Sequence, residues 1–151
     1  MPPTATTNDM SLRITEEIRV QASLEVTFEA LLEELGSSHQ VADDRPLPMK
    51  LEAWPGGRWF RDLGEDNGHL WGHVQAIKRP MLLEIWGPLF MSFAAVSNLQ
   101  YRLTPVDGGT LITFVHSAIG LIPDEVRTGM GNGWSYSHER IKRAAERSAR
   151  K

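Results

Sequence analysis

The strongest constraint on the fold comes from two consecutive segments, residues 99–104 and 110–116, in which large apolar and polar side chains alternate. The turn between them contains Gly108-Gly109, and the helical segment that follows opens at Pro123. Alternation of period two around a glycine turn predicts an antiparallel hairpin with one buried face. Because a long helix follows the hairpin directly, we expect that helix to cover the buried face and to leave room for a pocket between them.

The rest of the chain predicts further strands and one more helix. Residues 12–21 alternate as a strand does, and Ser23 is a good N-cap for a helix that stops at Gly36. Strand patterns recur at residues 49–54, 58–63, 69–77 and 81–86, and the last helix is predicted over residues 123–149. We expect one α+β domain over residues 11–151, a loop at residues 37–48 and disorder at residues 1–10.

The last helix contains three glycines in its first half, Gly129, Gly131 and Gly133. Each glycine costs about 1 kcal/mol relative to alanine inside a helix. We therefore expect a break or kink near residues 129–132, or a close approach of the helix to the sheet or to a ligand.

Composition excludes several classes of site. The chain has no cysteine, which removes thiol catalysis and thiolate metal sites and fits a cytoplasmic location. No apolar run approaches the roughly 20 residues of a membrane span. Residues 138–151 hold six basic and two acidic side chains, which we interpret as a solvated helix face and not as a nucleic-acid site.

The histidines at positions 69 and 73 do not predict a metal site. In a strand, residues four apart on one face lie roughly 13 Å from each other, which is too far for one ion. We therefore expect neither a metal nor a cofactor.

Several short motifs in a fixed order resemble a known family. They are Val26-Thr-Phe28, Pro55-Gly-Gly-Arg-Trp59, Gly72-His-Val74, Leu82–Trp86, Leu99–Pro105, Gly108–His116 and Gly133-Trp134. Their order is similar to that of the START-like (SRPBCC) superfamily, in its activator-of-heat-shock-protein-ninety-ATPase-like branch. The resemblance implies a helix-grip (START/Bet v-like) fold, in which an antiparallel sheet of about seven strands wraps around a long C-terminal helix.

The same resemblance implies an apolar cavity between the sheet and that helix. Family members serve as lipid or small-molecule carriers, polyketide cyclases or chaperone regulators. Two segments depart from the family pattern: residues 37–46 lack the usual tryptophans, and the last helix begins with unusually many glycines. Both should border the cavity mouth, so the specificity of relatives is not transferred.

Large rings and one histidine are the candidate ligand-binding residues. They are Trp59, Trp86, Tyr101, Phe114, His116, Met130 and Trp134. His116 shares the inner strand face, where it could bind a ligand, act as a general base or be satisfied by its surroundings. Glu84 would be a buried acid if it points inward and an ordinary carboxylate if it points outward.

Trp71 is expected to face outward with His73 and Gln75. An exposed tryptophan there, together with apolar residues 89–93, would suggest a homodimer interface.

The leading hypothesis is a protein that binds an apolar, aromatic or lipid-like small molecule in an internal cavity, and a non-enzymatic role is favoured. The first alternative is a cyclase or dehydratase that uses His116, with or without Glu84. The second is a chaperone ATPase-regulating module that uses the outer sheet and the basic C-terminal residues.

Overall fold

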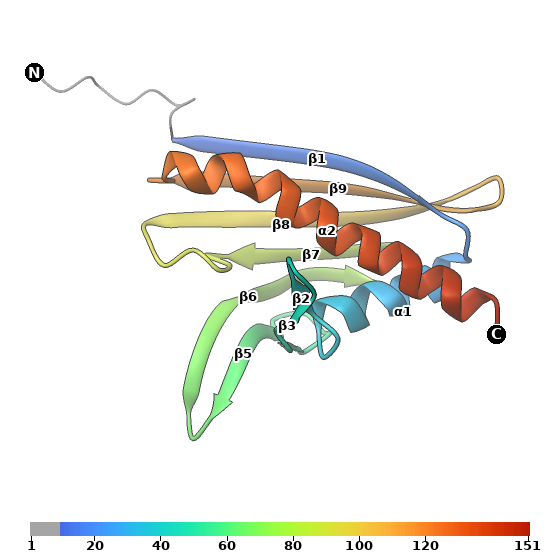
Figure 1. The fold of residues 1–151 in the computed structure, drawn as a ribbon, viewed down its shortest axis with the longest axis horizontal. Helices are drawn as coiled ribbons and strands as arrows, with labels where there is room; N and C mark the ends of the chain where they lie inside the picture. The colour runs from blue at the N-terminus through green and yellow to red at the C-terminus, as the bar shows by residue number, and fades with distance from the viewer. Residues whose placement is uncertain (1–9) are drawn as a thin grey trace, which may run out of the picture.

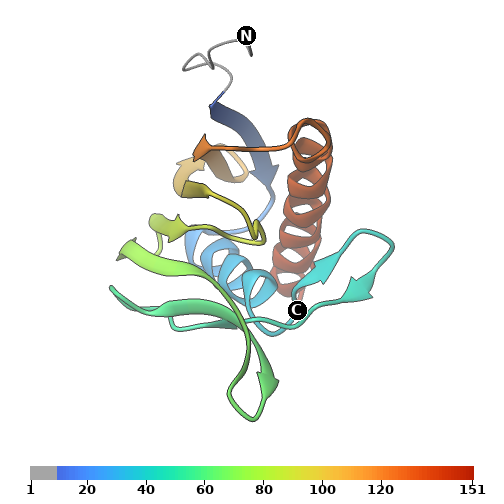
Figure 2. The same cartoon turned by 90° about the vertical axis from the view of Figure 1, so that its left-hand side faces the viewer.

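The computed structural model describes residues 10–151, and it has the α+β helix-grip architecture that the sequence predicts. A seven-stranded antiparallel sheet curves around the two helices (Figures 1 and 2). The elements in chain order are β1 (Ser11–Val20), α1 (Leu24–Leu35), β2 (Gln40–Val41), β3 (Arg45–Pro46), β4 (Lys50–Leu51), β5 (Arg58–Gly64), β6 (Asn67–Lys78), β7 (Leu82–Gly87), β8 (Ala95–Val106), β9 (Gly109–Gly120) and α2 (Asp124–Ala149).

The predicted hairpin forms two neighbouring strands of the sheet. The strand order is β1-β9-β8-β7-β6-β5-β4, so β8 and β9 lie side by side. Their register places Leu99 opposite His116 and Tyr101 opposite Phe114. All four side chains are buried, which confirms that this face points into the core under α2.

The first helix begins and ends as predicted. The hydroxyl of Ser23 accepts a hydrogen bond of 3.2 Å from the backbone N–H of Val26, as an N-cap does. At the other end, the indole N–H of Trp59 donates a 2.7 Å bond to the carbonyl of Leu35. That carbonyl is one of those that a helix end leaves without an internal partner, so Trp59 ties α1 to the sheet.

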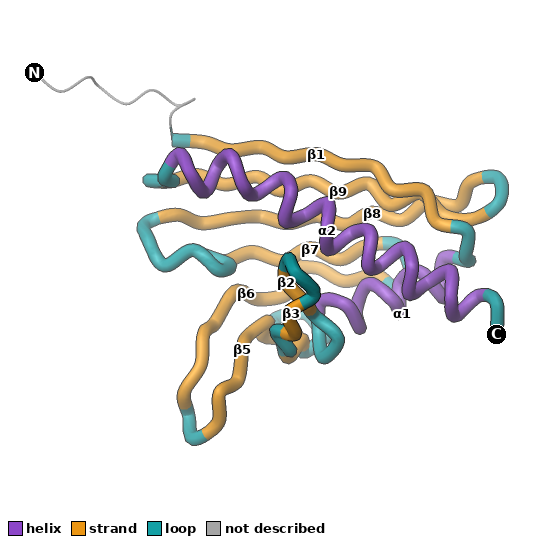
Figure 3. Tube along the Cα trace, in the orientation of Figure 1, coloured by secondary structure: helices purple, strands orange, loops and turns teal. Residues whose placement is uncertain are grey.

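The expected kink in the last helix is wrong, because α2 runs without interruption through its glycines (Figure 3). A Cβ atom added at Gly129, Gly131 or Gly133 would meet no other atom within 4 Å. The glycines therefore do not serve a close approach to the sheet. The helix keeps its course because a buried stripe anchors it to the core along its length: Met130, Trp134, His138, Ile141 and Ala145.

Two segments differ in detail from the predicted strands and loops. The predicted loop at residues 37–48 contains the short hairpin β2–β3, and the predicted strand at residues 49–54 shrinks to β4. The hairpin turns at Asp43 and Asp44, which take left-handed φ values of 67° and 55°. Aspartate tolerates this conformation better than most residues.

Disorder was predicted for residues 1–10, and all of these except Met10 lie outside the described residues. Among the described residues, no helix has the length and apolar character needed to cross a membrane.

Candidate functional site

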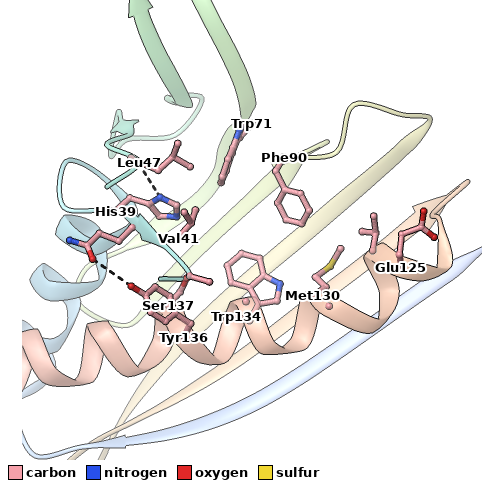
Figure 4. Close-up of a pocket in the computed structure, with 15 residues that line it drawn as sticks. His39, Val41, Leu47, Trp71, Phe90, Glu125, Met130, Trp134, Tyr136 and Ser137 are labelled. Atoms are coloured by element: carbon pink, nitrogen blue, oxygen red, sulfur yellow. Dashed lines mark hydrogen bonds between the residues drawn. The ribbon is translucent and has the colours of Figure 1, made fainter. Parts of the chain in front are cut away.

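A pocket of about 440 Å³ lies between the first half of α2 and the β2–β3 hairpin (Figure 4). Its wall is mainly apolar and aromatic. The lining residues are His39, Gln40, Val41, Ala42, Leu47, Trp71, Phe90, Glu125, Val126, Gly129, Met130, Gly133, Trp134, Tyr136 and Ser137. The two segments that depart from the family pattern both contribute to it.

On the side of α2, the pocket wall contains two large side chains and two glycines. Met130 and Trp134 point into the pocket one turn apart, and Gly129 and Gly133 precede them. Residues four apart lie on one helix face, so the two glycines form a strip without side chains. Gly131 lies off this strip and does not line the pocket. Gly129 and Gly133 thus leave space in the pocket that larger side chains would fill.

Trp71 forms the opposite wall, and the expectation that it faces outward is wrong. Trp59 pairs with Gly72 while Phe60 pairs with Leu70, so Trp71 is an extra residue in β6. Such a β-bulge interrupts the alternation of faces and re-aims a side chain. As a result Trp71 is only 7% exposed and points into the pocket.

The segment between β7 and β8 is hydrogen-bonded to this bulge and packs against it. The backbone N–H of Leu89 donates a 2.7 Å hydrogen bond to the carbonyl of Trp71, and the rings of Trp71 and Phe90 pack edge to face at 5.9 Å. At Gly87, where φ is +152°, a Cβ would collide with the Trp71 carbonyl. Leu89 and Met91 are buried. Phe90 in the same segment is 40% exposed, and a homodimer stays a prediction.

His39 closes the pocket on the hairpin side. Its Nδ1 lies 3.0 Å from the carbonyl of Leu47, and its own carbonyl accepts a 2.9 Å hydrogen bond from the Leu47 N–H. Burial lowers the pKa of His39, and the positive charge of Arg140 adds to this, against the opposing effect of the Leu47 bond. The ring is therefore neutral at pH 7. Sequence reasoning missed His39, and the only signal was the departure of its segment from the family pattern.

A second contact joins the hairpin to the helix at the rim of the pocket. The hydroxyl of Tyr136 donates a 2.6 Å hydrogen bond to the Asp44 carboxylate and a longer one, 3.5 Å, to the Gln40 side-chain oxygen. Burial raises the pKa of Tyr136, and the bond to Asp44 raises it further. Tyr136 thus stays protonated and holds the β2–β3 hairpin against α2.

His116, the leading catalytic candidate, is enclosed in the core and does not line the pocket. Its Nδ1 accepts a 3.0 Å hydrogen bond from the Trp134 indole, and its Nε2 lies 2.8 Å from the Ser97 hydroxyl. Burial lowers its pKa to about 4. Both ring nitrogens are therefore occupied, and the residue corresponds to the satisfied histidine that the sequence left as an alternative.

The interior beneath α2 holds a cluster of packed rings. The ring centroids of Tyr101 and Phe114 lie 4.8 Å apart, and those of Phe114 and Trp134 lie 4.9 Å apart. His138, which sequence reasoning missed, packs against all three. Its position four residues after Trp134, on the same helix face, was the available signal.

His138 also connects two polar groups. Its Nδ1 donates a 2.8 Å hydrogen bond to the Glu16 carboxylate, and its Nε2 lies 3.0 Å from the Tyr101 hydroxyl. Burial lowers the pKa of His138, although Glu16 opposes this shift. Burial also raises the pKa of Tyr101 well above its ordinary value. This network is satisfied within the protein and does not line the pocket.

The remaining predicted residues lie outside the pocket. Trp59 is fully buried at the end of α1, whereas Trp86 is 46% exposed on the outer face of the sheet, tilted against His73. Glu84 shares that outer face and accepts hydrogen bonds from Asn98 and Gln100, so the inward alternative for it is wrong. Of the seven predicted ligand-binding residues, Met130 and Trp134 line the pocket. Ligand contact by any of the seven stays a prediction.

The basic C-terminal residues are partly neutralised within the fold. Arg140 pairs with the Glu34 carboxylate, Lys142 with Glu146, and Arg143 with Glu139. Residues 10–151 contain no cluster of three or more His, Asp or Glu side chains placed to hold a metal ion.

Solved structures with the same fold are numerous, although their sequences are distant. An uncharacterized protein from Rhizobium leguminosarum has a TM-score of 0.71 at 16% identity, covering 91% of this chain and 95% of its own. A protein from Chromobacterium violaceum has a TM-score of 0.69 at 16% identity, with coverages of 89% and 98%. The di-domain ARO/CYC StfQ from the steffimycin biosynthetic pathway has a TM-score of 0.66 at 11% identity, with coverages of 95% and 53%.

No curated protein sequence matches this chain with significance. Residues 21–146 do match one protein family, which is described as "Activator of Hsp90 ATPase homolog 1-like protein". This match covers α1, every strand of the seven-stranded sheet except β1, and α2 up to residue 146, and the shared fold of the structural neighbours agrees with it. The chain therefore belongs to the Activator of Hsp90 ATPase homolog 1-like family.

Proposed function

We propose that this protein binds a small, predominantly apolar or aromatic molecule in the pocket between α2 and the β2–β3 hairpin. The observation that carries the proposal is the pocket itself, which has aromatic walls and a strip of helix without side chains. Its volume of about 440 Å³ lies in the range of known ligand pockets, roughly 300–1,000 Å³. Such sites are concave and mostly apolar, with a few polar groups that orient the ligand.

The glycine strip supports the proposal because it is costly for the helix. Alanine at Gly129 or Gly133 would meet no neighbouring atom and would favour the helix by up to about 1 kcal/mol. Folding alone therefore gives no reason for glycine at these positions. Space for a guest beside the helix does give one. Burial of the guest's apolar surface, at about 25 cal/mol per Å², would supply most of the affinity.

A binding role agrees better with the geometry than the enzymatic alternative. A cyclase or dehydratase that used His116 would need a ring nitrogen that reaches the substrate. Trp134 and Ser97 occupy both nitrogens of His116, and Glu84 lies on the outer face. The likeness to StfQ supports a fold that can be used in a biosynthetic pathway, but at 11% identity no reaction is transferred from it.

The test compares leucine at two neighbouring glycines of the same helix. Gly133→Leu adds a side chain to the pocket, whereas Gly131→Leu adds the same side chain outside it. Both changes favour the helix, so both variants should fold. The neutral fluorescent probe N-phenyl-1-naphthylamine is titrated into each variant and into the wild type.

We expect Gly133→Leu to weaken probe binding about tenfold, because extra volume in a filled apolar site costs about 1–3 kcal/mol. Gly131→Leu should bind the probe like the wild type. Equal affinities of the two variants, or no binding of the probe to the wild type, would refute the proposed site.

A further inference from the structure

His39 is a buried residue of the pocket wall, whereas Gln40, Tyr136 and Ser137 are half-buried and Glu125 is exposed. A carbonyl can only accept a hydrogen bond, so the contact of His39 Nδ1 with the Leu47 carbonyl places the ring hydrogen on Nδ1. In the neutral ring, Nε2 then carries a lone pair and no hydrogen. His39 therefore presents a hydrogen-bond acceptor at Nε2.

That acceptor has no partner within the protein. Nδ1 is the only ring nitrogen of His39 in a hydrogen bond among residues 10–151, although the side chain is only 7% exposed. Across the same residues, the fully buried side-chain atoms that lack a partner are Thr27 Oγ1 and Arg140 Nε. Nε2 of His39 is not one of them, so this atom keeps some exposure, and His39 lines the pocket.

The ring is also held firmly in place. The ring Nδ1–H of His39 donates to the Leu47 carbonyl, and the backbone N–H of Leu47 donates to the His39 carbonyl. The Trp71 ring packs edge-on against the imidazole at a centroid distance of 5.7 Å. An acceptor that is positioned before the ligand arrives loses little entropy on binding.

The charge of the pocket wall further restricts which ligands can bind. The wall contains no lysine or arginine, and its one charged side chain is Glu125. A carboxylate or phosphate on the ligand would therefore meet no cation in the wall and one repelling charge, because Arg140, whose charge acts on His39, is paired with the Glu34 carboxylate. A neutral group that donates a hydrogen bond would find Nε2 of His39.

From these observations we propose that the pocket selects a neutral ring compound bearing a hydroxyl or another hydrogen-bond donor, and that Nε2 of His39 accepts the bond from that donor. This inference rests on the proposed function, since it assigns the polar recognition at the same pocket. It places the specificity of the site in the β2–β3 segment, which departs from the family pattern.

Three naphthalene derivatives of similar size test the proposal by isothermal titration calorimetry at pH 7. The first is 2-naphthol, which can donate a hydrogen bond. The second is 2-methoxynaphthalene, which cannot, and the third is the anion 2-naphthoate. We expect 2-naphthol to bind about three- to tenfold more tightly than 2-methoxynaphthalene, the usual worth of one net hydrogen bond. 2-Naphthoate should bind most weakly.

The variant His39→Asn tests the acceptor atom Nε2 separately from the bond between Nδ1 and the Leu47 carbonyl. An asparagine amide N–H can take the place of Nδ1 against the Leu47 carbonyl, but asparagine has no atom at the position of Nε2. The preference for 2-naphthol should therefore fall to about one, with the affinity for 2-methoxynaphthalene retained. Equal binding of the two neutral compounds by the wild type would overturn the inference and leave the proposed function standing. Failure of all three compounds to bind would overturn the proposed function.

A measurement on the wild type makes the test independent of how the variant folds. In ¹⁵N NMR spectra, the Nε2 resonance of His39 should shift when 2-naphthol is added and stay in place with 2-methoxynaphthalene. An Nε2 resonance that responds equally to both compounds, or that shows a hydrogen bound to Nε2 in the free protein, would contradict the assignment.

Discussion

The indole N–H of Trp134 donates a 3.0 Å hydrogen bond to Nδ1 of His116. This bond holds Trp134, which lines the pocket, against the core. The donated bond requires Nδ1 to be free of hydrogen, and this fixes the hydrogen of the neutral ring on Nε2, facing the Ser97 hydroxyl at 2.8 Å. His116 therefore positions Trp134 for the pocket and does not reach the pocket itself.

The burial of His116 predicts a pH dependence of stability. Its pKa in the folded protein is about 4, against an ordinary value of 6.5. Between these values the unfolded chain takes up a proton that the folded chain does not, so stability is complete above pH 6.5 and declines as the pH falls. From pH 7 to pH 5 this group accounts for a loss of about 2 kcal/mol.

Urea denaturation of the wild type and His116→Gln at pH 7 and pH 5 measures that loss. The variant should lose about 2 kcal/mol less than the wild type between the two pH values. His39 and His138, whose pKa values are also lowered by burial, contribute to both proteins and cancel in the comparison. Parallel losses in the two proteins would contradict the prediction.

The bond from Trp59 to the end of α1 predicts that two tryptophans respond differently to the same substitution. Trp59→Phe leaves the Leu35 carbonyl without its 2.7 Å partner and opens a small cavity, at a cost of about 2–3 kcal/mol. Trp54 is 57% exposed, so Trp54→Phe should change stability by no more than about 0.5 kcal/mol. Chemical denaturation gives both values, and similar losses in the two variants would count against this role for Trp59.

The uninterrupted course of α2 predicts that Gly131→Ala stabilises the protein. The added methyl group meets no neighbouring atom, and alanine favours the helix by about 0.5–1 kcal/mol. Gly120→Ala is the matched control, because φ there is +140° and the new Cβ would collide with the Ala94 carbonyl. Thermal unfolding should show a higher midpoint for the first variant and a lower one for the second. A lower midpoint for Gly131→Ala would contradict a regular helix at this position.

The chain's two tyrosines allow a test of the buried network around His138. Tyr101→Phe keeps the ring but removes the hydroxyl that lies 3.0 Å from Nε2 of His138, leaving a buried acceptor unpaired at a cost of about 1–3 kcal/mol. Tyr136→Phe removes a hydroxyl that bonds to the exposed Asp44, so we expect a loss below about 1 kcal/mol. Urea midpoints at pH 7 give the comparison, and the reverse order of losses would be inconsistent with this network.

The sequence by itself determined the features that depend on local periodicity and capping. Alternation in residues 99–116 was enough to predict the β8–β9 hairpin and the inward direction of His116, because successive side chains in a regular strand point to opposite faces. Ser23 and Gly36 were enough to place α1, because capping depends on neighbouring residues. Short motifs in a fixed order predicted the family, and the family match over residues 21–146 confirms it.

Only the tertiary structure decided where the pocket lies. One extra residue in β6 turned Trp71 inward, and such a shift of register cannot be seen in the alternation of a single strand. His39 became a pocket residue because the β2–β3 hairpin folds against α2, a contact between segments about 95 residues apart, as the Tyr136–Asp44 bond at a separation of 92 residues illustrates. Local sequence sets the conformation of each element, but the pairing of distant elements determines which side chains share a cavity.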